Sequence, residues 1–183
     1  MNFKSIKDPV DFQNFKEARK PFVVQNLKDI RTAQLAYKTS NGAYADNFDT
    51  LLTFIKMDSI VQVKSSGNIP DGMNEKEAID GGYYKKETTK VPAQKVIFSD
   101  EYLATREKGV GFSIDSLKYI PFSTEVYDIA SSKIERNGVK VPVFEVVTKN
   151  DVLYRNWEKR FYSNEKQWAI GSMVDPSTAG NWE

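Results

Sequence analysis

A run of helical periodicity near the N-terminus constrains this chain more than any other sequence feature. Between Pro9 and Tyr37, apolar and long side chains recur at steps of three and four residues, the spacing of one face of an α-helix. Asp8 can cap a helix that starts with Pro9, and the Ser40-Asn41-Gly42 segment is typical of a helix end. We therefore predict a helix of about 30 residues, about 45 Å long, which is kinked or divided in two at Pro21.

The second half of the chain has the pattern of an antiparallel sheet. Residues 126–136 and 139–148 flank Asn137-Gly138, the pair preferred by a type I′ hairpin turn because both positions need a positive φ. Shorter strands are predicted at residues 59–64, 96–98, 116–121 and 168–171, and a short helix at residues 48–55.

Together these elements predict an α+β fold, in which a long N-terminal helix packs on an antiparallel β-sheet with a C-terminal β-hairpin. No internal repeat, low-complexity linker or domain boundary is evident. We expect a single domain over residues 1–183, with the helix in residues 1–40 and an α+β globular part in residues 41–183.

Composition excludes several classes of function. The 183-residue chain has no cysteine and no histidine, so it has no thiol nucleophile, no serine–histidine–aspartate triad, and no thiolate or imidazole zinc site. The formal net charge of +1 gives no field that attracts a polyanion, and we expect no nucleic-acid partner. Paired carboxylates can hydrolyse glycosides, but nothing distinguishes a pair such as Asp100 and Glu101. We therefore expect no enzymatic activity and no cofactor.

One segment carries a family resemblance. Residues 31–44 read Arg-Thr-Ala-Gln-Leu-Ala-Tyr-Lys-Thr-Ser-Asn-Gly-Ala-Tyr, and Phe48-Asp49-Thr50-Leu51-Leu52 follows. A long N-terminal helix ending in Leu-Ala-Tyr, then a turn, Gly-x-Tyr and a short helix, resembles the type IV pilins and the pseudopilins of type II secretion. The match covers about residues 9 to 55. The sequence departs from the family in lacking its apolar N-terminal segment, its prepilin peptidase site and the cysteine pair of many pilins.

The resemblance implies a structural or assembly subunit of the bacterial cell envelope. Such a protein is periplasmic or on the cell surface, is anchored to the inner membrane by a segment upstream of Met1, and has envelope or filament proteins or further copies of itself as partners. As written, residues 1–183 contain no run of 18 apolar residues and are expected to be soluble.

The apolar residues at the start of the predicted helix have two interpretations. Either they form an exposed end that needs a partner or a membrane-proximal setting, or they fold back onto the core. These residues are Phe3, Ile6, Val10, Phe12 and Phe15.

A rival hypothesis is a soluble extracytoplasmic binding module that recognises a protein or a glycan. Tyr83 and Tyr84, followed by two lysines, resemble the aromatic and basic surfaces of some binding proteins, although lysines also protect edge strands from aggregation. Trp157, Arg160 and Tyr162 are residue types enriched at interfaces, although some of them could instead close the core.

A metal site has one weak candidate. Asp46, Asn47 and Asp49 place three oxygen donors close together, as calcium loops do. Helix capping explains the same residues, and we favour capping because a calcium loop supplies more carboxylates and a central glycine. The Gly109-Val110-Gly111 segment is not followed by a phosphate-loop pattern, so nucleotide binding is not expected.

Overall fold

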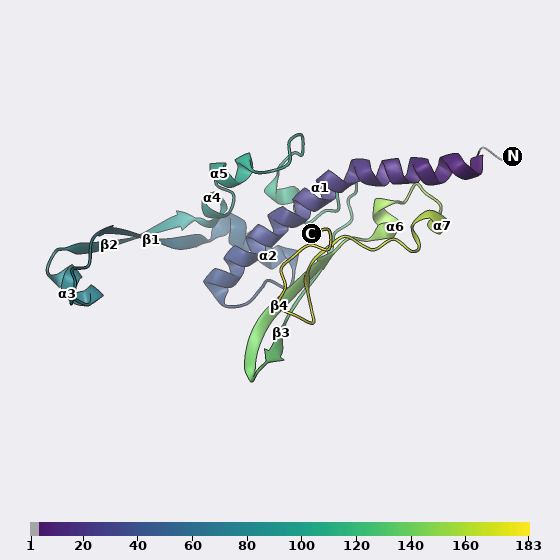
Figure 1. Cartoon of the computed structure of the whole chain (residues 1–183). Helices are drawn as coiled ribbons and strands as arrows, with labels where there is room; N and C mark the ends of the chain where they lie inside the picture. Colours follow the sequence, from purple (N-terminus) through teal and green to yellow (C-terminus); the bar gives the residue numbers. More distant parts are fainter. Residues whose placement is uncertain (1–3) are drawn as a thin grey trace.

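The long N-terminal helix is the axis of the molecule. The computed structural model describes the backbone from Lys4 to Glu183 and the side chains from Pro9 onward, and α1 is Lys4–Asn41 (Figure 1). The predicted long helix is confirmed, although α1 begins at Lys4 and so already includes Asp8, the predicted cap. α1 continues through Pro21 without dividing, and its axis changes direction about half-way along its length (Figure 1). The kinked form of the prediction is therefore the one found.

The end of α1 is tied to the segment that follows it. Gln34 is fully buried; its Nε2 donates to the Ala45 carbonyl at 2.8 Å, and its Oε1 accepts from the Ala45 N–H at 2.9 Å. This pair of hydrogen bonds folds residues 42–47 back against α1. The chain then enters α2 (Phe48–Met57), whose apolar face is buried, as the sequence pattern predicts.

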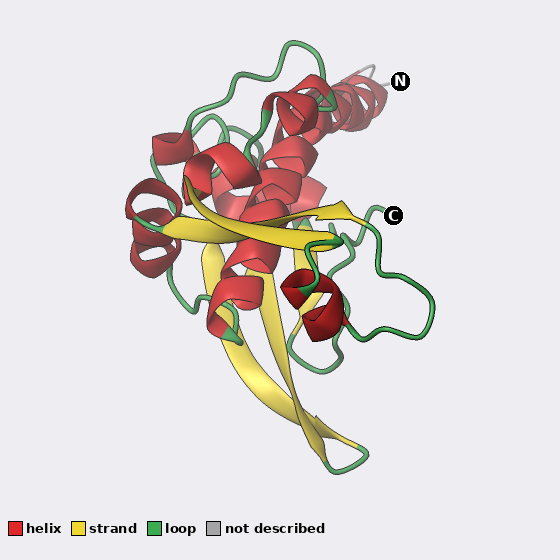
Figure 2. Cartoon of the chain, turned by 90° about the vertical axis from the view of Figure 1, so that its left-hand side faces the viewer, coloured by secondary structure: helices red, strands yellow, loops and turns green. Residues whose placement is uncertain are grey.

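The predicted hairpin is confirmed. β3 (Asp128–Arg136) and β4 (Val139–Val147) pair antiparallel, and Asn137 and Gly138 take φ values of 51° and 77°. β5 (Ala169–Ser172) adds a third antiparallel strand beside residues 144–147 of β4. The hairpin tip projects beyond this sheet in both views (Figures 1 and 2).

A separate two-stranded ribbon leaves the body of the molecule. β1 (Ser59–Gly67) and β2 (Tyr84–Pro92) pair antiparallel along their whole length. The connection between them carries α3 (Glu75–Asp80), capped by Asn74 and Glu77 in a reciprocal capping box. The ribbon extends away from α1 with α3 at its far end (Figure 1).

Two predicted strands are not formed. Residues 96–98 belong mainly to α4 (Ala93–Ile97), which buries Ala93 and Ile97 on one face; three apolar residues are too few to distinguish a strand from a helical turn. Ser116 is the last residue of the 3₁₀ turn η1 (Ile114–Ser116), and residues 117–121 make only an isolated bridge, between Tyr119 and Val126. The polar segment between these two regions contains α5 (Asp100–Ala104).

The C-terminal part of the chain covers the N-terminal half of α1. α6 (Asn150–Leu153) and α7 (Lys159–Tyr162) are single turns that lie beneath this half of the helix (Figure 1). Their buried side chains join the core formed by α1, α2, α4 and the three-stranded sheet. The largest fully buried side chains of this core include Tyr154, Phe12, Phe144, Leu27, Ile30, Leu51 and Ile170.

Candidate functional site

The apolar start of α1 divides into a buried part and an exposed part. Phe12 is only 1% exposed; its ring centroid lies 5.2 Å from those of both Tyr154 and Trp157. Phe15 is partly buried and also contacts Trp157. The structure thus folds these two phenylalanines back onto the core, whereas Val10 is exposed. Phe3 and Ile6 lie outside the side chains that the structure describes.

The aromatic residues near the C-terminus mostly close this core. Tyr162 is buried, and Trp157 is partly buried between Phe12 and Phe161. Arg160 is exposed, forms an ion pair with Glu158 and does not join the core. Of the two alternatives for these residues, core closure therefore applies to Trp157 and Tyr162, and only Arg160 is left exposed to a partner.

Of the three side chains that could supply oxygen ligands after α1, Asn47 caps α2. The Asn47 side chain accepts a hydrogen bond from the Thr50 N–H at 2.8 Å, and Asp46 accepts from the Asn47 amide at 2.7 Å. Asp49 lies in the first turn of α2, where a negative charge is favourable. Among the described side chains, no three acidic residues come together as metal ligands.

Replacing Asn47 with alanine is expected to lower the free energy of unfolding by about 1 kcal/mol, because the Thr50 N–H loses its acceptor. Urea denaturation would measure this, with Asp46→Ala as a control that leaves the cap in place. Calcium should leave the melting temperature unchanged in both the parent chain and Asn47→Ala. A calcium-dependent rise that Asn47→Ala abolishes would contradict the capping interpretation.

Tyr83 and Tyr84 lie at the outer end of the ribbon. Tyr83 is exposed, and Tyr84 is half-buried opposite Gly67 in the strand pairing. Lys86 forms an ion pair with Glu75 of α3. Tyr83, Tyr84 and Lys86 therefore share the outer end of the ribbon.

Sequence reasoning missed a buried ionic centre on α1. Asp29 is 1% exposed and accepts hydrogen bonds from the Arg106 guanidinium at 2.9 to 3.2 Å. Gln25 Nε2 and the Tyr102 hydroxyl also donate to Asp29, at 2.9 and 2.8 Å. Arg106 in turn donates to the carbonyls of Val110 and Gly111. The centre thus ties the segment around α5 to the middle of α1.

Two tyrosines close to Asp29 hold their protons tightly. Burial, with a smaller contribution from the Asp29 charge, raises the pKa of Tyr102 from its usual value of 10.0 to about 12. Burial also raises the pKa of Tyr127 well above its usual value, and the Tyr127 hydroxyl is buried without a hydrogen-bond partner. Neither group titrates near neutral pH.

The free energy of unfolding is expected to fall as the pH rises from about 10 to about 12. In that interval Tyr102 loses its proton in the unfolded chain but keeps it in the folded protein, so alkali favours unfolding. Urea denaturation at several pH values should show that the free energy of unfolding depends less on pH for Tyr102→Phe than for the parent chain. The exposed Tyr83 gives the control Tyr83→Phe. If the free energy of unfolding depended equally on pH in Tyr102→Phe and in the parent, the raised pKa of Tyr102 would be contradicted.

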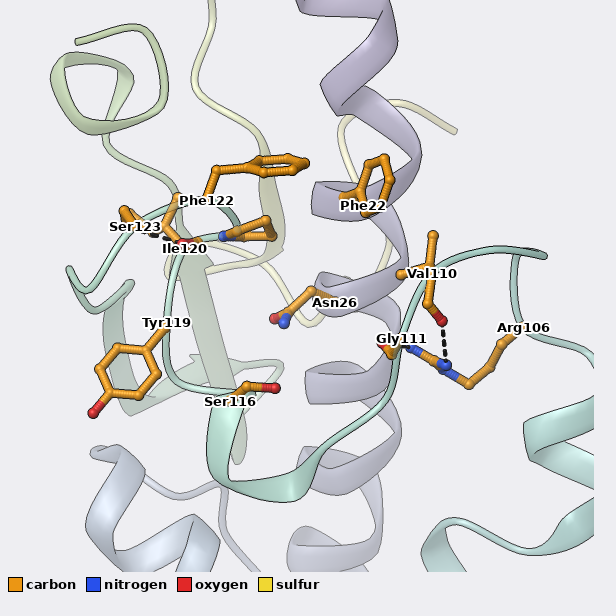
Figure 3. A pocket seen from close by; sticks show the side chains of 11 residues that line it. Phe22, Asn26, Arg106, Val110, Gly111, Ser116, Tyr119, Ile120, Phe122 and Ser123 are labelled. Atoms are coloured by element: carbon orange, nitrogen blue, oxygen red, sulfur yellow. Dashed lines mark hydrogen bonds between the residues drawn. The ribbon is translucent and has the colours of Figure 1, made fainter.

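A cavity of about 250 Å³ lies beside this centre. α1 contributes Phe22 and Asn26, the loop after α5 contributes Val110 and Gly111, and residues 116–123 form the opposite wall (Figure 3). Figure 3 shows the Asn26 side chain extending from α1 toward that wall. Asn26 Oδ1 is buried and has no hydrogen-bond partner. The lining is mainly apolar, with a few polar groups, as small-ligand sites are.

Phe122 stands at the edge of this cavity in an unusual backbone conformation. Its φ is 66°, a region that favours glycine, in a turn closed by the Ser123 N–H donating to the Ile120 carbonyl at 3.1 Å. The Phe122 ring meets Phe22 edge-on at 5.0 Å, and the Arg19 guanidinium lies 4.6 Å from its centroid. Strained residues of this kind occur preferentially at functional sites.

Comparison with known proteins adds no assignment, since no family model, curated protein or solved structure matches the chain. No helix in the part of the chain from Lys4 onward is both long enough and apolar enough to cross a membrane.

Proposed function

We propose that this chain is a non-enzymatic structural or assembly subunit of the bacterial cell envelope, similar to pilins and pseudopilins. One observation carries the proposal: a 38-residue N-terminal helix packs along a C-terminal antiparallel sheet, and its N-terminal half continues past that sheet (Figure 1). Such a helix gives a subunit one end for anchoring and one end for a globular domain.

The segment that carries the family resemblance lies where its residues support this architecture. Tyr37 packs edge-on against Phe54 of α2 at 5.2 Å, and Tyr44 packs on Phe144 of β4 at 4.5 Å. Ser131 of β3 donates to the Tyr44 carbonyl at 3.0 Å. The tyrosines of the Leu-Ala-Tyr and Gly-x-Tyr patterns therefore join α1, α2 and the sheet.

The proposal assigns the outer face of the N-terminal half of α1 to contacts with neighbouring subunits. This face is exposed, whereas the opposite face is covered by α6 and α7. Its exposed members are Gln13, Asn14, Glu17, Ala18 and Pro21. The proposal also includes an apolar anchor encoded upstream of Met1, which places the globular part outside the cytoplasm.

Cell fractionation tests the location directly. With an epitope tag after Glu183, the protein expressed from its own gene should be found in the inner-membrane fraction and be digested by protease added to spheroplasts. A cytoplasmic marker protein, protected from the same protease, is the control. Recovery of the tagged protein in the protected soluble fraction would contradict the proposal.

A second candidate function, recognition of a small and mostly apolar group, is favoured by the cavity that Phe22 and Phe122 help to line. Its volume of about 250 Å³ is slightly below the range of drug-sized sites, roughly 300–1,000 Å³. It would therefore accept a group the size of one aromatic ring system rather than a glycan chain.

For this candidate, Phe122→Gly is expected to change the free energy of unfolding by less than about 1 kcal/mol. Relief of the positive φ, about 1–2 kcal/mol, offsets the loss of ring contacts worth about 0.5–1.5 kcal/mol. Binding of indole, used as a probe in an NMR titration, should weaken at least roughly tenfold because the aromatic ring at the edge of the cavity is lost. Unchanged binding, or a loss of more than about 3 kcal/mol of stability, would assign Phe122 a purely structural role.

A further inference from the structure

The ribbon of β1 and β2, together with its tip, exposes an unusual amount of apolar surface. We call residues 59–92 the arm. Val61 and Val63 are 54% and 56% exposed, and both point to the same face because they are two residues apart in one strand. Further exposed apolar side chains of the arm are Ile69, Met73, Ile79 and Tyr83. An isolated two-stranded ribbon is marginally stable in water, so this surface suits a partner.

Both strands of the arm also have an open edge. β1 and β2 form a two-stranded sheet, so each strand pairs on one side only. Along residues 61–67 and 85–90 every side chain is exposed, which means that neither face of the ribbon is covered there. Open edges of this kind can accept a further strand.

Charge along the arm changes sign between its two parts. The shaft, residues 59–67 and 84–92, contains four lysines and one glutamate. The tip, residues 68–83, contains four acidic residues and one lysine. Because each part has the opposite charge to the other, two copies of the arm are complementary when they lie antiparallel, and repel each other when they lie parallel.

We propose that the arm binds the arm of a second copy of this chain, in an antiparallel two-fold arrangement with the tip of each copy against the shaft of the other. In such an interface the same surface is used by both copies, so every favourable contact occurs twice. Val61 and Val63 lie in the shaft and would be covered by the partner's tip. The inference goes beyond the proposed function, because it uses no residue of α1.

Sedimentation equilibrium of the full chain tests this pairing with charge reversals at exposed positions. One variant, Lys64→Glu with Lys90→Glu, reverses the shaft; another, Asp71→Lys with Asp80→Lys, reverses the tip. Lys133→Glu with Lys140→Glu, in the exposed β3–β4 hairpin, is the matched control. Circular dichroism would show that all variants remain folded.

The parent and the control variant should form dimers whose affinity falls with added salt. Each reversal should weaken dimerisation at least roughly tenfold, because the tip and the shaft then carry like charge. An equimolar mixture of the two reversed variants should restore dimers, since each variant complements the other. A monomeric parent, dimers insensitive to both reversals, or a mixture that stays monomeric would each overturn the antiparallel arrangement.

Discussion

The free energy of unfolding is expected to fall by about 3–5 kcal/mol when Asp29 is replaced by alanine. Asp29 is buried and is the shared acceptor of Gln25, Tyr102 and Arg106. Its removal leaves the Arg106 side chain, itself only 8% exposed, as a buried charge without its carboxylate. Urea denaturation followed by tryptophan fluorescence would measure the loss.

A double-mutant cycle separates the ion pair from its surroundings. Asp29→Ala and Arg106→Ala should each lower the free energy of unfolding strongly. The double variant should lower it by clearly less than the sum of the two single effects, because no unpaired charge remains. The exposed pair of Glu75 and Lys86 is the control, and Glu75→Ala should cost no more than about 1 kcal/mol. If Asp29→Ala lowered the free energy of unfolding by as little as Glu75→Ala, the structural role of the buried centre would be contradicted.

Phe12→Ala is expected to lower the free energy of unfolding by a similar amount, about 3–5 kcal/mol. The Phe12 ring contacts Tyr154, Trp157 and Phe161, with centroid distances of 5.2, 5.2 and 6.0 Å. Truncation leaves a cavity between α1 and the C-terminal turns, where these rings cannot easily collapse. Hydrogen exchange should show faster opening of α6 and α7 than in the parent chain.

The neighbouring exposed residue Val10 supplies the control for Phe12. Val10→Ala removes an apolar side chain from the same part of α1 without opening a cavity, and should change stability by no more than about 0.5 kcal/mol. Equal effects of the two substitutions would show that the N-terminal half of α1 projects freely and does not pack on the C-terminal segment.

Local chemistry explains which parts of the fold were predictable. Asn137 and Gly138 determine the hairpin because asparagine and glycine tolerate the positive φ that its turn requires, and this preference does not depend on distant residues. Residues 96–98 carry no such preference. Val96 and Ile97 are helical because Ala93 and Ile97 reach the core on one side of α4, a tertiary contact that a three-residue apolar run does not reveal.

The buried centre and the cavity depend on contacts between distant segments. Asp29 and Arg106 are 77 residues apart in the chain, so spacing gave no indication of their pairing. One signal was present: Asp29 lies between Leu27 and Ile30 on the buried face of α1, where a charge needs a partner. Phe122 had no comparable signal, because its strain appears only in the backbone of the folded turn.

In-cell crosslinking through single cysteines tests the assembly role of α1 most directly. The native chain has no cysteine, so Gln13→Cys or Glu17→Cys places one reactive thiol on the outer face of the helix. A short bis-maleimide applied to cells producing either variant should yield a crosslinked dimer, because the proposed function packs this face against other copies. Lys133→Cys, on the exposed hairpin, should remain monomeric. Only monomers from both α1 variants would contradict the proposal.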